Sequence, residues 1–104
     1  MSIDVQQLFS SMAQSAKDTL GEGGEVVSQE LISLLESSKS GLAELAKARA
    51  SGLISQLDFE REVEREKQVL EAELIALEIQ AKVAIQKAVN AAADTFKAAL
   101  SAAV

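Results

Sequence analysis

The sequence contains no cysteine, histidine, proline, tryptophan or tyrosine, and its aromatic residues are three phenylalanines. Without cysteine the chain can form neither disulfide bonds nor thiolate metal sites, and this composition fits a reducing compartment such as the cytoplasm. Without histidine it also lacks the commonest metal ligand and the commonest general base near neutral pH. We therefore expect no bound metal, no cofactor and a cytoplasmic protein.

Few other residues could support catalysis. Serine is frequent, but no serine stands in a nucleophile elbow and no histidine is present to activate one. The stretch GEGG at 21–24 lacks the Lys-Ser/Thr pair of a phosphate-binding loop, and no strand pattern precedes it. We expect a protein that is not an enzyme.

Glutamates are concentrated in one stretch of the chain, comprising Glu60, Glu62, Glu64, Glu66, Glu71, Glu73 and Glu78. A di-iron helical bundle combines inward glutamates with Glu-x-x-His pairs, and an EF-hand needs a loop rich in Asp and Asn. The sequence has neither pattern. These carboxylates are therefore interpreted as a solvated helix face.

Positive charge is scarce, because 10 Lys and Arg face 16 Asp and Glu and give a net charge of −6. Binding to nucleic acid needs a basic surface, so we expect no nucleic-acid partner. The longest uncharged stretch, residues 5–16, is interrupted by Gln and Ser, whereas a spanning helix needs about 20 apolar residues. The first residues also lack the pattern of a secretory signal, so we expect a water-soluble chain.

The residues that are present favour helix throughout one domain, 1–104. Apolar residues make up 48% of the chain, and many are alanine, the best helix former. Apolar positions recur at spacings of three and four, which predicts helices over about 3–20, 25–50 and 56–102. Ser2 is the expected cap of the first helix and Gly21 its end. The cluster Ser37, Ser38, Ser40 and Gly41 weakens the middle of the second helix.

The segment ASGLISQLDF, residues 50–59, predicts a tight corner between the second and third helices. Gly52 ends one helix, and Ser55 caps the next, with Asp58 three residues later in a near capping box. Ile54 and Phe59 have the spacing of a hydrophobic staple. We expect the apolar side chains of this corner to plug the end of the bundle, namely Leu53, Ile54, Leu57 and Phe59.

The third helix, 56–102, has no internal glycine or proline and would be about 70 Å long. One apolar stripe alternates spacings of four and three: Leu70, Leu74, Leu77, Ala81, Ala84, Ala88 and Ala91. Such a heptad pattern drives helix-on-helix coiling. A second apolar face carries Ile75, Ile79, Val89, Phe96 and Leu100. Because one hairpin cannot cover both faces over this length, we expect the stripe, called the heptad seam below, to be an oligomer interface.

The sequence thus predicts an all-α protein in which two long antiparallel helices and a shorter N-terminal helix assemble into an oligomeric bundle or coiled coil. The function most consistent with this is a structural or protein-interaction role, with a second copy of the chain as partner. A first alternative is an amphipathic protein on a membrane or apolar particle, supported by Lys82, Lys87 and Lys97 but opposed by the absence of tryptophan. A second alternative is an acidic adaptor or inhibitor of a larger protein.

Overall fold

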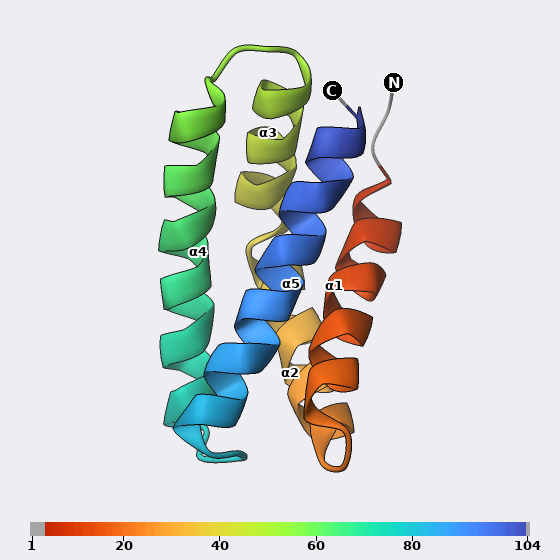
Figure 1. Ribbon diagram of the computed structural model, residues 1–104, viewed down its shortest axis with the longest axis vertical. Coiled ribbons are helices and arrows are strands. Elements are labelled where there is room, and N and C mark those ends of the chain that lie inside the picture. Colours follow the sequence, from red (N-terminus) through yellow and green to blue (C-terminus); the bar gives the residue numbers. More distant parts are fainter. Residues whose placement is uncertain (1–3, 104) are drawn as a thin grey trace.

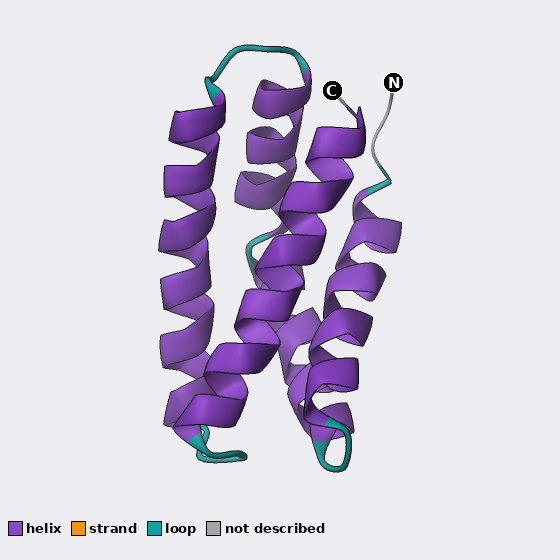
Figure 2. Ribbon diagram, viewed as in Figure 1, coloured by secondary structure: helices purple, strands orange, loops and turns teal. Residues whose placement is uncertain are grey.

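The structure is a computed structural model that describes residues 4–103. Its regular elements are five helices: α1 (Val5–Leu20), α2 (Gly24–Ser37), α3 (Lys39–Ala50), α4 (Gln56–Ala76) and α5 (Lys82–Ala103). The prediction of an all-α chain is confirmed (Figure 2). Helices α2 and α3 lie end to end along one side of the bundle (Figure 1). From α1 to the α2–α3 pair, then to α4 and to α5, the chain reverses its direction at each step. As a result, α1 begins and α5 ends at the same end of the bundle.

The first helix follows its prediction closely. Asp4 caps α1, because its Oδ1 accepts a hydrogen bond from the backbone N of Gln7 at 3.1 Å. The expected cap, Ser2, lies outside the described residues. At the other end, Gly21 and Gly23 adopt φ values of 64° and 83°, which glycine reaches without steric cost, and the chain reverses there into α2.

The second predicted helix, 25–50, is wrong as a continuous element. It is interrupted at Ser38, whose φ of −100° and ψ of 12° end α2 and precede α3. The interruption falls in the serine-rich stretch that was expected to weaken the middle of this helix. Leu35 and Leu42 lie on either side of the break, and both are buried in the core. The two short helices therefore present one apolar face to the rest of the bundle.

The third predicted helix, 56–102, is also wrong as a single element. It ends at Ala76, residues 77–81 form a turn, and α5 begins at Lys82 and folds back along α4. The longest dimension of the molecule is only 38 Å, about half the length that the uninterrupted helix would need. The arrangement is therefore a folded-back bundle and not a hairpin of two long helices.

The core explains why the chain turns. Of the residues described, every buried side chain is apolar. Helix α5 packs on both α1 and α4, so most of the two apolar faces predicted for the third helix is covered within one chain, although Leu77 and Ala81 stay exposed. Phe59 of α4 and Phe96 of α5 lie in contact, with ring centroids 5.7 Å apart. The fold therefore does not require a second chain to cover these two apolar faces.

Candidate functional site

The heptad seam is split between two helices and a turn. Leu70 and Leu74 on α4 and Ala88 on α5 are buried in the core, and Ala84 and Ala91 are partly buried. Leu77 and Ala81 lie in the turn between α4 and α5 and are exposed, with 47% of Leu77 accessible to solvent. Five of the seven seam residues are therefore at least partly covered inside the chain, and the two exposed ones are neighbours at one end of the bundle.

The part of the heptad seam that lies on α5 packs against α1 of the same chain. Ser15 Oγ of α1 and Thr95 Oγ1 of α5 form a hydrogen bond of 2.6 Å, and each hydroxyl also lies about one hydrogen-bond length from a backbone oxygen of its own helix. Alanines at the buried positions of both helices allow this close approach: Ala13, Ala16, Ala88, Ala92 and Ala93. The alanines on α5 were expected to bring a second chain close, and they bring α1 close instead.

A groove of about 510 Å³ continues this contact towards the end where α1 begins. Its walls come from Asp4, Gln7, Leu8 and Ser11 on one side and Thr95, Ala98 and Ala99 on the other. The groove is mainly apolar, and its one carboxylate already accepts the capping hydrogen bond of α1. It offers a shallow surface without a second charged group to orient a ligand.

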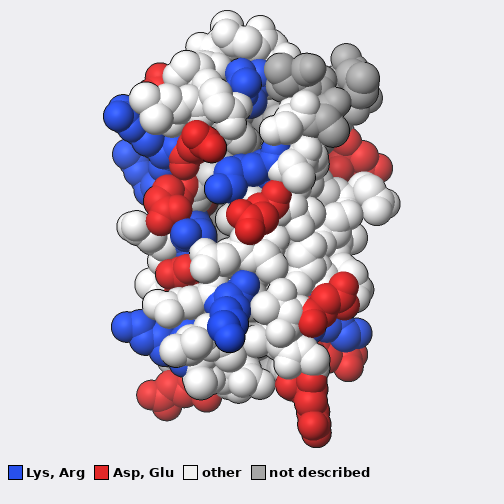
Figure 3. Space-filling model, viewed as in Figure 1, with Lys and Arg blue, Asp and Glu red and all other residues white. Residues whose placement is uncertain are grey.

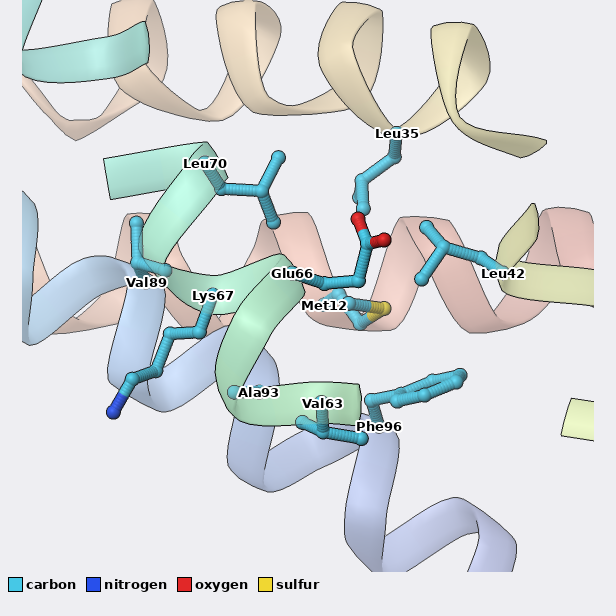
Figure 4. A pocket seen from close by; sticks show the side chains of 10 residues that line it. All are labelled: Met12, Leu35, Leu42, Val63, Glu66, Lys67, Leu70, Val89, Ala93 and Phe96. Carbon is cyan, nitrogen blue, oxygen red and sulfur yellow. The ribbon is translucent and has the colours of Figure 1, made fainter. Parts of the chain in front are cut away.

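A small, partly open pocket lies where the α2–α3 break faces α4, with further lining from α1 and α5 (Figure 4). Its volume of about 20 Å³ has room for about one water molecule. The lining is apolar except for Glu66, whose carboxylate points towards Leu35 and Leu42, and Lys67, whose ammonium group points away from it. A pocket of this size accommodates neither a substrate nor a cofactor.

The turn between α4 and α5 contains an unusual backbone conformation. Glu78 has a φ of 56°, the only positive value at a residue other than glycine within 4–103. L side chains adopt this left-handed conformation at a cost of about 1–2 kcal/mol. The turn also touches another part of the chain, because the side-chain amide of Gln80 lies close to Gly23 in the α1–α2 connection. Tertiary contacts therefore maintain a local conformation that the sequence disfavours.

The corner between α3 and α4 is built around the predicted residues. Gly52 has a φ of 78°, and Ser55 Oγ accepts a hydrogen bond from Asp58 N at 3.1 Å. Phe59 is buried, and Ile54 packs against the core. The expectation that all four apolar side chains of this corner plug the bundle is wrong for the remaining two. Leu53 and Leu57 are 79% and 59% exposed and point into solvent.

Charged side chains lie on the surface, with both signs interspersed over the face shown in Figure 3. Among residues 4–103, no three acidic, histidine or cysteine side chains are grouped as a metal site would require. Lys67 Nζ lies 2.9 Å from Glu64 Oε2, and this hydrogen bond holds the pKa of the Glu64 carboxyl below its ordinary value of 4.5. In the described part of the chain, no helix is both long and apolar enough to cross a membrane.

Comparison with models of protein families, with curated proteins and with solved structures finds no match to this chain. Large exposed apolar side chains occur at the corner (Leu53 and Leu57), in the α4–α5 turn (Leu77) and singly along the helices (Val26, Ile32, Val69 and Val83). Sequence reasoning treated the first pair as core, because a helical pattern shows which residues are apolar but not which of them another element covers.

Proposed function

We propose that this protein is a non-catalytic helical module whose role is to bind protein, and that its first partner is a second copy of the chain. The observation that carries the proposal is the exposure of Leu77 and Ala81, which belong to a seam whose other members are covered. An apolar seam that continues onto the surface favours helix-on-helix association there.

The chemistry of the molecule supports a role in binding. Every buried side chain in residues 4–101 is apolar, and no charged side chain in that range is fully buried. Active sites usually place polar and titratable groups in a cleft and shift their pKa values strongly. Here the pocket lined by Glu66 and Lys67 has room for about one water molecule, and the Glu64 carboxyl, whose pKa is lowered by Lys67, lies exposed on the surface.

Sedimentation velocity of the purified chain over a range of micromolar concentrations tests the proposal. We expect a concentration-dependent dimer or higher oligomer. Leu77→Lys should weaken it, because burying an unpaired ammonium group opposes association. Leu53→Lys is the matched control, since it adds the same charge to an exposed leucine at the opposite end of the bundle.

Two results would contradict the proposal. One is a chain that stays monomeric at every concentration. The other is equal loss of association in both variants, which would place the interface away from the seam. Flotation of the chain with lipid vesicles, in the absence of self-association, would favour the membrane or apolar-particle alternative instead.

A further inference from the structure

We propose that two copies of this chain associate by exchanging α5: in each copy α4 and α5 join into one continuous helix, and α5 packs on α1 and α4 of the other copy. This inference rests on the proposed self-association and specifies its form. Exchange of an identical element is a low-cost route to a dimer, because every contact of α5 is made again with the partner. The observations that support it are concentrated in residues 77–81.

The turn sequence is the first observation. Residues 77–81 read LEIQA and contain none of the residues that usually form turns, namely Gly, Pro, Asn or Asp. No glycine or proline occurs anywhere from Leu53 to the end of the chain. Leu, Glu, Gln and Ala are good helix formers, so the local preference of this segment is helical. The closed chain forms a turn against that preference.

The backbone at Glu78 is the second observation. Its φ of 56° is costly for a residue with a Cβ atom, and short connections under strain favour exchange. In a continuous helix Glu78 would return to an ordinary helical φ, and the cost would disappear. The other turns of the bundle with positive φ use glycine and carry no such strain, so the strain singles out the α4–α5 connection.

The register of the heptad seam is the third observation. Its spacing of four and three passes through the turn without a break, from Leu74 to Leu77, Ala81 and Ala84. Joining α4 and α5 would therefore place Leu77 and Ala81, exposed in the closed chain, on the same face as the buried seam residues. In a two-fold dimer these segments of the two copies cross, and each covers the apolar residues of the other.

A disulfide probe distinguishes exchange from simple contact between closed chains. The protein has no cysteine of its own, and the Ser15 and Thr95 side-chain oxygens are 2.6 Å apart. In the double variant Ser15→Cys, Thr95→Cys, a closed chain forms the bond within one chain. An exchanged dimer forms it between chains, which denaturing electrophoresis without reductant resolves. The protein is refolded from urea at low and high concentration before oxidation, and Ser15→Cys alone reports random cross-linking.

Substitution of Lys82 identifies the connection that opens. Lys82 is the first residue of α5, a position that tolerates proline, whereas the same residue would lie inside the continuous helix. Lys82→Pro should therefore keep the closed chain and weaken the dimer by about a hundredfold per chain. Lys82→Ala removes the same charge, permits the helix and should leave the dimer intact. Glu78→Gly should weaken the dimer by at least about tenfold, because glycine relieves the turn and disfavours the helix.

The expected result is an interchain disulfide that increases with protein concentration during refolding and is lost in the Lys82→Pro background. A dimer whose disulfides are all within chains would overturn the exchange while leaving self-association intact. An interchain disulfide that persists in the Lys82→Pro background would also overturn it, because another connection would then be open. A chain that is monomeric throughout would refute both this inference and the proposed function.

Discussion

Replacing Phe59 by alanine should lower the free energy of unfolding by about 3–4 kcal/mol. The ring is buried where α4 meets α5, and its centroid lies 5.7 Å from that of Phe96. Truncation of a buried Phe to Ala costs about 3–5 kcal/mol through lost burial and the cavity left behind. The aromatic contact accounts for about 1 kcal/mol of this loss. Small domains are stable by about 5–15 kcal/mol, so a loss of this size is readily measured.

Urea unfolding followed by far-ultraviolet circular dichroism provides the assay, with the midpoint expected to fall at an unchanged slope. Leu57→Ala is the matched control two residues away. Because Leu57 is 59% exposed, its truncation should change the free energy of unfolding by no more than about 0.5 kcal/mol. Combining Phe59→Ala with Phe96→Ala should cost about 1 kcal/mol less than the sum of the single losses, since the two rings share a contact.

Two outcomes would refute this reasoning. If Phe59→Ala unfolds at the same urea concentration as the parent, Phe59 does not lie in the core. If Leu57→Ala costs as much as Phe59→Ala, the corner is plugged by both side chains, as the sequence alone suggested, and the exposed position of Leu57 is incorrect.

Three further changes test other parts of the structure. Ser55→Ala should lower the free energy of unfolding by about 1 kcal/mol in the same urea assay, because α4 loses its capping hydrogen bond, and an unchanged midpoint would contradict the cap. Ala88→Leu should cost about 1–3 kcal/mol by overpacking a fully buried site, whereas Ala98→Leu, on the exposed side of the same helix, should be nearly neutral. Glu64→Gln should lower the melting temperature slightly at neutral pH, because Lys67 depresses the pKa of the Glu64 carboxyl and so favours the folded state above its ordinary value of 4.5. This difference from the parent should disappear as the pH falls through the lowered pKa and should shrink in high salt, and a difference that persists in acid would rule out the ion pair as its cause.

Local chemistry was sufficient to place several elements from the sequence. The end of α1 at Leu20 and the start of α4 at Gln56 follow from Gly21 and Ser55, whose effects depend on the backbone of a few neighbouring residues. The serine-rich stretch around Ser38 marked the weak point of the second helix, although the sequence did not show that it would break there. Helix propensity shows which segments form helix weakly, but tertiary packing determines whether a weak helix stays continuous.

The sequence alone determined that this chain is helical, where its corner would lie, and that residues 70–91 carry an unbroken apolar seam. Only the tertiary structure decided that the third segment folds back at 77–81 and that α1 covers the alanines of α5. The physical reason is that burial of α5 against α1 and α4 depends on residues distant in sequence, and its free energy outweighs the unfavourable φ of Glu78. A helical pattern shows that a face is apolar, whereas the three-dimensional arrangement determines whether the same chain or another one covers it.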